Sequence, residues 1–399
     1  MAAWRRSRDE ETVLIGTKLN FRTGSGVFVS SEHFGRGERR GRQDKILHAS
    51  VKLLGLATAT PSHIIRQTDA AAAAFQAFAG RFDGFDRIAQ VFETTGIVER
   101  HLVRSIEWYL EPKGWPERSV AYLEAASALY IEAAGKALAA AGIRPEEVDS
   151  VVTVSSTGIA TPSLDARVSR SMGFRVDIER VPLFGLGCAG GVSGLSIARR
   201  LAEARPGAVV LFVAVELCSL SFRLDELTKA NIVASALFAD GAAACVLRQS
   251  EGRGEGEIAE FEASGEHLWP GTLDIMGWKI DPQGLGVIFD RAIPPFAQRH
   301  VGPAVNAILS RAGLCLADVD RFICHPGGTK VISALEESLA LVSGTLDHER
   351  AVLAAYGNMS APTVLFVLEK AIKAGLPHRS ALLAMGPGFT ASCLTLSSA

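Results

Sequence analysis

The chain has 399 residues, of which 48% are hydrophobic and 21% charged, and its formal net charge is -2 at pH 7. This composition is typical of a soluble globular protein with ample material for a core, and the charge gives no reason to expect a nucleic-acid partner. No apolar run reaches the roughly 18 residues that a membrane helix needs, and no signal peptide is visible, so we expect a cytoplasmic protein without a membrane span.

Residues 1–49 lack periodic apolar positions and contain basic, glycine-rich stretches such as "RGERRGRQDK". This pattern favours a disordered, solvated arm over a binding patch. The compact fold is predicted to start near Val51, where "VKLLGLATATP" has the apolar character of a first strand. Helices are expected next in "AAAAFQAFAG" and "DRIAQVFETTG".

Two segments 171 residues apart predict the same order of elements. "AAGKALAAAGIRPEEVDSVVTVSST" and "AVNAILSRAGLCLADVDRFICHPGG" each indicate an amphipathic helix, a glycine stop at Gly142 or Gly313, a short acidic loop and a buried strand. The repeat predicts two similar α/β halves, residues 50–249 and residues 250–399, although chance similarity of α/β units is an alternative.

A second pair of segments matches at an offset of 170 residues. The helix "VSGLSIARRLAEARPG" leads into the strand "AVVLFVAVE", and the helix "APTVLFVLEKAIKAGLP" leads into "SALLAMGPG". Cys188 precedes the first helix and Asn358 the second. Continuous apolar strands that alternate with helices imply sheets covered on both faces. If the halves pack with pseudo-two-fold symmetry, these two helix starts converge.

Cys188 lies in the stretch "GLGCAGGVSG", among Gly187, Gly190 and Gly191. A helix N-terminus lowers the pKa of a thiol from about 8.5 and so favours the nucleophilic thiolate. The glycines allow a sharp turn and leave room for an acyl group. The pattern alone leaves open whether Cys188 is a nucleophile or a buried structural cysteine. The other five cysteines are expected to be small buried hydrophobic residues, without metal-type spacing.

His325 ends the second predicted strand, before Pro326, and could reach a crevice at the carboxyl end of the sheet or be a satisfied core histidine. Asn358 taken alone is more typical of a helix N-cap. Together with Cys188 they have separable tasks. His325 can take the thiol proton and hold an ion pair with the thiolate. His325 and Asn358 can both donate to an enolate oxygen, which suits decarboxylation of a malonyl thioester and requires no metal.

At these residues the sequence resembles the type III polyketide synthases, the chalcone synthase-like family of the thiolase superfamily, from about residue 50 to the end. The marks are "GCAGGVSGL", "ALFADGAAACVL", "HPGG", "YGNMS" and "MGPGFT". The resemblance implies a thiolase-like five-layer αβαβα fold, built from the two duplicated halves, and a homodimer. It also implies an acyl thioester on Cys188, malonyl-CoA as direct extender and no cofactor beyond these substrates.

The resemblance further implies a set of substrate-binding residues. Phe222 matches the family's gatekeeper phenylalanine between the CoA tunnel and the cavity, and Trp278 matches the second gatekeeper position. Thr161 replaces the methionine that plant members send across the dimer interface. The remaining positions of the set are Ser156, Thr157, Cys218, Ser360 and Gly386.

The donor and the starter are less constrained. The basic residues with which plant members hold CoA do not align with "QVFETTGIVERHLV", so an acyl carrier protein is an alternative to acyl-CoA. We predict a medium or long fatty acyl starter and an alkylresorcinol or alkylpyrone product, because residues 104–126 resemble bacterial members that extend fatty acyl thioesters. Ala160, Thr161 and Cys218 are small enough to line a tunnel, in which each buried CH2 contributes about 0.8 kcal/mol.

Three other functions are kept as alternatives. Two lie within the superfamily: a malonyl-primed synthase of the tetrahydroxynaphthalene type, and a ketoacyl-ACP synthase that performs one condensation. The third comes from another class, a cysteine hydrolase, because papain-like proteases also use Cys-His-Asn.

Overall fold

The computed structural model describes residues 49–251 and 256–398. The predicted arm, residues 1–49, lies outside this part of the chain except for Ala49. The first strand, β1 (Ala49–Ala59), covers the segment from Val51 that the sequence predicts as a strand.

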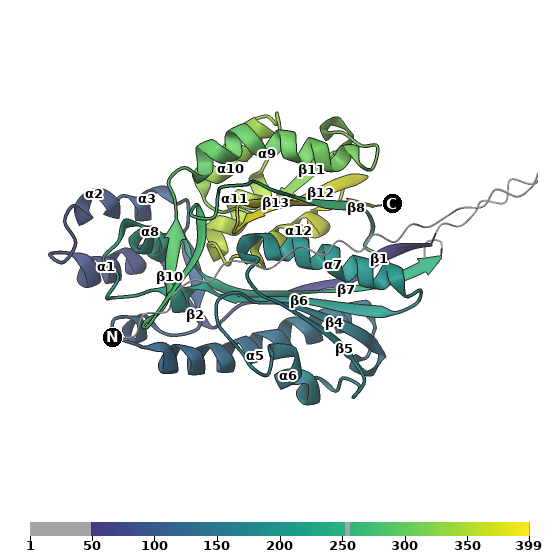
Figure 1. Cartoon of the computed structure of the whole chain (residues 1–399), viewed down its shortest axis with the longest axis horizontal. Helices are drawn as coiled ribbons and strands as arrows, with labels where there is room; N and C mark the ends of the chain where they lie inside the picture. The colour runs from purple at the N-terminus through teal and green to yellow at the C-terminus, as the bar shows by residue number, and fades with distance from the viewer. Residues whose placement is uncertain (1–48, 252–255, 399) are drawn as a thin grey trace, which may run out of the picture. The chain divides into compact units, whose positions relative to one another are not determined.

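Within the described residues, nine strands form one continuous sheet (Figure 1). In spatial order the strands are β11 (Arg321–Cys324), β12 (Arg379–Gly386), β13 (Thr390–Ser397), β8 (Ala259–Leu268), β1, β7 (Asp240–Glu251), β6 (Val209–Leu217), β4 (Val148–Val154) and β5 (Glu179–Leu183). β1 and β8 share three residue pairs, from Val51 with Phe261 to Leu53 with Ala259. This junction joins two portions of the sheet that lie in different layers.

Helices cover both outer faces and fill the space between the two portions (Figure 1). α5 (Trp115–Ala141) and α6 (Leu164–Met172) cover the portion that contains β1, β7, β6, β4 and β5. α9 (Ile293–Ser310) packs on β8 and β13, beside α10 (Thr329–Ser338). α7 (Gly190–Ala204) and α12 (Thr363–Ala374) lie between and contact strands of both portions. The expected thiolase-like αβαβα layering is confirmed.

The internal repeat is also found in the structure. α5 ends at a left-handed Gly142 with φ of 65° and precedes β4, as α9 precedes Gly313 with φ of 72° and then β11. These φ values suit glycine, which explains both stops. α7 precedes β6 as α12 precedes β12.

The starts of α7 and α12 meet in the central layer, as the repeat predicts. A Cβ on Gly191 would lie 2.3 Å from the carbonyl oxygen of Ala361, so only glycine allows this approach. Apolar side chains of both helices join one buried core with those of the flanking strands, including Val192, Phe212 and Val364.

Smaller elements border the layers. α1 (Gln67–Phe78) confirms one predicted helix, whereas "DRIAQVFETTG" forms two short helices instead of one, α2 (Phe85–Ala89) and α3 (Val91–Thr94). The others are β2 (His63–Arg66), β3 (Glu99–Leu102), α4 (Ile106–Tyr109), α8 (Lys229–Leu237), β9 (Met276–Asp281), β10 (Gly284–Phe289) and α11 (Asp347–Tyr356).

Cys315 is exposed, so the prediction that it is a small buried hydrophobic residue is wrong. It precedes a 3-10 turn, Leu316–Asp318, and its backbone N–H donates to the Asp318 carboxylate at 2.8 Å, which places it in a surface connection. The buried cysteines are Cys218, Cys245, Cys324 and Cys393. No helix of the described ranges has the length and apolar character that crossing a bilayer requires.

Candidate active site

Cys188 sits in a 3-10 turn, Gly187–Ala189, immediately before α7. This turn lies against the end of β12. A Cβ on Gly386 would lie 2.4 Å from the carbonyl oxygen of Leu186, and a Cβ on Gly187 would lie 2.7 Å from Cδ of Pro387. Both glycines are therefore required for this close approach, and Gly386, predicted to bind substrate, has a packing role at the cysteine turn.

Ser156 and Thr157 follow β4, and Ser156 hydrogen-bonds the cysteine turn. The Ser156 hydroxyl accepts from the N–H groups of Gly185 at 3.1 Å and Gly187 at 3.4 Å. The Ser156 N–H donates to the Glu216 carboxylate at 2.9 Å, and Thr157 also hydrogen-bonds this carboxylate. Since Glu216 is fully buried, it anchors both residues beneath the cysteine.

A sequence of contacts connects the three predicted catalytic residues. The Ser360 side chain hydrogen-bonds Cys188. The Ser360 N–H donates to Oδ1 of Asn358 at 2.8 Å, and Nδ2 of Asn358 donates to the carbonyl oxygen of Gly327 at 3.4 Å. Gly327 lies under the His325 ring, because its Cβ would be 3.7 Å from Nε2 of that ring. Asn358 is not an N-cap, since the residue at that position of α12 is Pro362.

The Ser360 backbone has φ of 59°, in the left-handed region that residues other than glycine rarely adopt. Such strain is concentrated at functional sites, where the surrounding structure holds it in place. Here it turns the chain between Asn358 and α12 so that Ser360 reaches Cys188.

Burial controls the protonation of the catalytic pair. Cys188 is partly exposed, yet burial of its thiol raises the pKa to about 12, with a smaller increase from Glu216 and a decrease from the Ser360 hydrogen bond. Burial lowers the pKa of His325 to about 4, and neither ring nitrogen has a hydrogen-bond partner among the described residues. Burial thus opposes the charged form of each residue, which counteracts the effect of the helix N-terminus on the thiol. The ion pair between the Cys188 thiolate and His325 stays a prediction.

Cys188 opens into a small pocket lined largely by apolar side chains. Trp278, Cys218 and Ser360 of the predicted set lie in its wall. Phe238 also lies there, with its ring centroid 6.2 Å from that of Trp278, and pairs with Asn358 through a parallel β-bridge. The sequence analysis did not single out Phe238, although the motif "ALFADGAAACVL" contains it.

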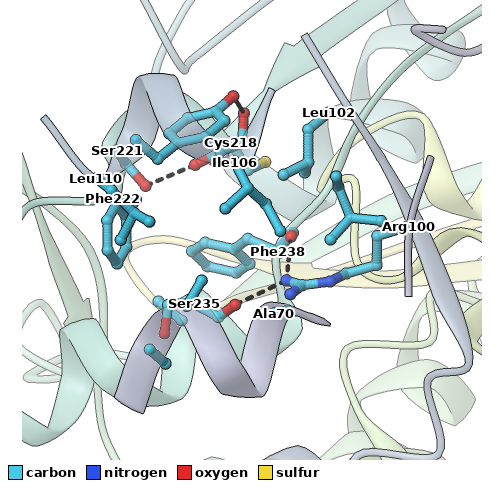
Figure 2. A pocket seen from close by; sticks show the side chains of 16 residues that line it. Ala70, Arg100, Leu102, Ile106, Leu110, Cys218, Ser221, Phe222, Ser235 and Phe238 are labelled. Atoms are coloured by element: carbon cyan, nitrogen blue, oxygen red, sulfur yellow. Dashed lines mark hydrogen bonds between the residues drawn. The ribbon is translucent and has the colours of Figure 1, made fainter. Parts of the chain in front are cut away.

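A second, apolar pocket adjoins the first and shares Cys218 and Phe238 with it (Figure 2). Phe222 lines this second pocket and not the one at Cys188. Its ring centroid is 5.8 Å from that of Phe78 and 6.3 Å from that of Tyr109. Phe222 and Phe238 thus lie in the wall of the same apolar pocket, and Phe238 also lines the pocket at Cys188.

Thr161 and Ala160 line a third pocket, together with the exposed Ile159 and Phe184. Within one copy of the chain they are absent from the wall of the Cys188 pocket. Of the three residues predicted to line a tunnel, Cys218 lies in the wall of the Cys188 pocket, whereas Ala160 and Thr161 line a different pocket of the same chain.

A fourth pocket, of about 480 Å³, borders the chain segment that follows His325, residues 327–331. Its wall includes Gly327, which lies under the His325 ring, and Phe289, which also lines the Cys188 pocket. Three cations border it, Lys229, Arg291 and Lys330, and none has an ion-pair partner in the described ranges. These positions, which the sequence analysis missed, can attract an anionic group. The described residues contain no cluster of three potential metal ligands.

The sequence matches two family profiles, "Chalcone and stilbene synthases, N-terminal domain" over residues 38–250 and "Chalcone and stilbene synthases, C-terminal domain" over residues 260–399. A 1,3,6,8-tetrahydroxynaphthalene synthase of Streptomyces peucetius subsp. caesius is 37% identical over 89% of this chain and 95% of its own length. The alpha-pyrone synthesis polyketide synthase-like Pks18 of Mycobacterium tuberculosis is 29% identical over 84% and 88%. The crystal structure of 1,3,6,8-tetrahydroxynaphthalene synthase from Streptomyces coelicolor A3(2) gives a TM-score of 0.82 at 28% identity, over 87% of this chain and 99% of that one.

Proposed function

Because the chain belongs to the chalcone and stilbene synthase family, the type III polyketide synthases, it is an acyltransferase that condenses malonyl-CoA units, and we propose that it extends a fatty acyl starter carried on Cys188. The contacts from Cys188 through Asn358 to the His325 loop support the catalytic part of this proposal. Cyclisation of the extended chain would give an alkylresorcinol or alkylpyrone. Family membership sets aside the cysteine hydrolase interpretation.

Loading begins with attack of the Cys188 sulfur on the thioester carbonyl of the starter. His325 takes the thiol proton during the attack and returns it to the departing CoA sulfur. The new S–C bond forms as the bond to CoA breaks, so no oxidant or reductant is needed. A neutral imidazole suits this step because its free nitrogen can accept the proton.

Extension then uses the donors of His325 and Asn358. Loss of CO2 from malonyl-CoA moves an electron pair onto the thioester oxygen, and the imidazole N–H and the amide N–H stabilise the resulting enolate. The enolate carbon attacks the acyl group on Cys188 and the C–S bond breaks, so that the sulfur leaves as a thiolate with the negative charge that the malonyl carboxylate carried. The chain, now two carbons longer, is on CoA and can acylate Cys188 again.

We propose that the donor is a CoA thioester whose phosphates bind Lys229, Arg291 and Lys330 at the 480 Å³ pocket. From there the acyl arm would pass Gly327 and Phe289 toward Cys188. In Lys330→Glu we expect KM for malonyl-CoA to rise roughly fivefold or more, because an exposed ion pair contributes up to about 1 kcal/mol and reversal adds repulsion. KM for malonyl-N-acetylcysteamine, which lacks phosphates, should be unchanged.

A matched control is Lys136→Glu, on the exposed face of α5. An equal rise of KM for both thioesters in Lys330→Glu, or no rise for either, would contradict the phosphate contact. If the wild-type protein were acylated by an acyl carrier protein but not by acyl-CoA, the CoA donor would be wrong.

The apolar pocket next to Cys218 is the observation that favours a fatty acyl starter. Apart from Arg100 and a few hydroxyls, its wall consists of apolar groups such as Ala70, Ala74 and Leu110 (Figure 2). Burial of an alkyl chain against such groups contributes about 0.8 kcal/mol per CH2. Since the pocket borders Cys218 and Phe238, a starter on Cys188 can direct its tail into it.

The experiment is a starter panel with product masses. We expect dodecanoyl- to octadecanoyl-CoA to give a higher kcat/KM than acetyl-, malonyl- or coumaroyl-CoA, with CO2 and a pyrone or resorcinol as products. In Cys188→Ala the acyl-enzyme adduct and the polyketide should both disappear, whereas malonyl-CoA decarboxylation should persist. An adduct on Cys218 or Cys324 would contradict Cys188 as the nucleophile.

Malonyl-primed synthesis is the second candidate, and two observations favour it. The relative with 37% identity is a 1,3,6,8-tetrahydroxynaphthalene synthase. The apolar pocket encloses about 70 Å³, which is space for roughly five water-sized groups, so a long tail enters only if side chains rotate. A pentaketide formed from malonyl-CoA alone, as fast as any product of a mixture, would establish this function instead.

We also propose that the protein is a homodimer. β5 lies at the edge of the sheet, where its free side can pair with another strand. Ile159, Phe184 and Ile280 are 55%, 54% and 65% exposed around the pocket that contains Thr161. Such clustered apolar exposure is typical of an interaction surface.

A further inference from the structure

Arg100 is a buried cation that the catalytic steps above do not use. It lies on β3, is 3% exposed, and extends its guanidinium among the side chains of the apolar pocket (Figure 2). Its Nη1 donates to the carbonyl oxygen of Ser235 at 2.8 Å and to that of Phe238 at 2.7 Å. Burial lowers the Arg100 pKa to about 10, with Asp240 opposing the decrease, so the group is charged at neutral pH.

Both carbonyls belong to the C-terminal end of α8. The last carbonyls of a helix have no partner within it and carry partial negative charge, so a cation there is stabilising. Arg100 satisfies two of them, and Nε2 of Gln67 donates to a third, that of Ala236, at 2.9 Å. These two side chains fix the direction in which Phe238 leaves the helix.

The stem of Arg100 meets the end of another helix. α11 ends at Tyr356, and the next residue, Gly357, has φ of 69°. A Cβ on Gly357 would lie 2.9 Å from Cγ and Cδ of Arg100. Arg100 thus fills the space between the ends of α8 and α11. The residues that follow these ends toward the active site are Phe238 and Asn358.

The two chain segments held by Arg100 are also bonded to each other. The Asn358 N–H donates to the carbonyl oxygen of Leu237 at 2.9 Å, and the carbonyl oxygen of Asn358 accepts from the Ala239 N–H at 2.9 Å. A shift of either helix end would therefore displace Asn358 and Phe238 together, relative to Cys188.

We propose that Arg100 is a positioning residue, which acts through Asn358 and Phe238 on the decarboxylation of malonyl-CoA. This proposal rests on the function proposed above for Asn358. Loading of Cys188 does not depend on the amide of Asn358, whereas stabilisation of the enolate does. A displacement of about 1 Å at such a donor can cost about 100-fold in rate. Loss of Arg100 should therefore slow the decarboxylation of malonyl-CoA and leave the acylation of Cys188 nearly unchanged.

The test compares Arg100→Met, which keeps a stem and removes the donors, with Arg100→Lys. In Arg100→Met we expect kcat for CO2 release from malonyl-CoA to fall at least tenfold. KM for malonyl-CoA should stay within threefold of wild type, as should the rate of Cys188 acylation by acetyl-CoA, whose acyl group is too short to fill the pocket that Arg100 lines. Arg100→Lys, which can donate to one carbonyl, should recover part of kcat. The matched control is Arg379→Met, which removes a half-buried arginine that bonds Glu262 at 2.8 Å and lies on neither of these helices.

Two results would overturn the proposal: decarboxylation at the wild-type rate in Arg100→Met, or an equal fall of acylation and decarboxylation, which would indicate a general structural role. If Arg100→Met does not fold, Gly357→Ala disturbs the same contact, because its methyl group would lie 2.9 Å from the Arg100 stem, in addition to the strain of alanine at φ of 69°. A selective loss of decarboxylation in Gly357→Ala would support the proposal, and wild-type decarboxylation would overturn it. A wild-type protein that neither acylates Cys188 nor releases CO2 would refute the proposed function and this role with it.

Discussion

Replacement of Glu216 by glutamine tests how burial sets the electrostatics of the cysteine site. The Glu216 carboxyl is completely buried, and burial raises its pKa to about 7 against its hydrogen bonds with Ser156 and Thr157. Its negative charge in turn raises the pKa of Cys188. Glutamine keeps an acceptor for the Ser156 N–H, 2.9 Å away, and removes the charge.

The sign of the stability effect follows from the direction of the Glu216 shift. The folded protein binds the proton more tightly than the unfolded chain, whose pKa is the ordinary 4.5. The free energy of unfolding therefore falls as pH rises from about 4.5 to about 7, by about 1.4 kcal/mol per pKa unit, or about 3 kcal/mol in all. The free energy of unfolding of Glu216→Gln minus that of the wild type should thus be about 3 kcal/mol larger at pH 8 than at pH 4.5.

Urea unfolding followed by tryptophan fluorescence at the two pH values measures this difference. Glu349→Gln is a matched control, because Glu349 is also fully buried with a pKa raised to about 7, but bonds the Cys324 N–H instead. Both variants should show the pH-dependent gain, and only Glu216→Gln should speed alkylation of Cys188 by iodoacetamide at pH 8 to 10. An equal stability difference at both pH values in Glu216→Gln would refute the reasoning.

Two further predictions concern the starter and the assembly. Phe222→Ala should open the apolar pocket and shift kcat/KM toward longer acyl-CoA starters, roughly fourfold per additional buried methylene; an unchanged chain-length profile across a series of acyl-CoA thioesters would place the tail elsewhere. Ile159→Arg, in the exposed apolar cluster around Thr161, should convert a dimer into monomers in sedimentation velocity, whereas Val342→Arg, at an exposed apolar residue outside that cluster, should leave the assembly unchanged.

Much of the fold could be predicted from the sequence because its signals are local. A glycine that stops a helix and an apolar strand that follows it lie within 20 residues, and their recurrence at Gly142 and Gly313 identifies the two halves. The glycines around Cys188 are equally visible as a local pattern, although their neighbours are distant in sequence, since Gly187 meets Pro387 and Gly191 meets the carbonyl oxygen of Ala361.

The neighbours of Cys188 could not be predicted in the same way. Phe222 and Phe238 both lie after short polar or small-residue stretches, and which ring faces the cysteine depends on how α8 ends against Arg100 and Gln67. Arg100 lies more than 130 residues from the carbonyls that it binds. Nothing in the sequence around Phe238 indicates its contact with Arg100.

The protonation of Cys188 is a case in which a local argument includes only one of several opposing effects. A helix start favours the thiolate, and the sequence contains that signal in the glycines before α7. Desolvation and the charge of Glu216 oppose it, and both arise from strands that are brought together only in the folded layers. The same burial keeps the His325 imidazole neutral. In the proposed mechanism, proton transfer to His325 therefore accompanies the first acyl transfer, whereas each extension releases the Cys188 sulfur as a thiolate for the next one.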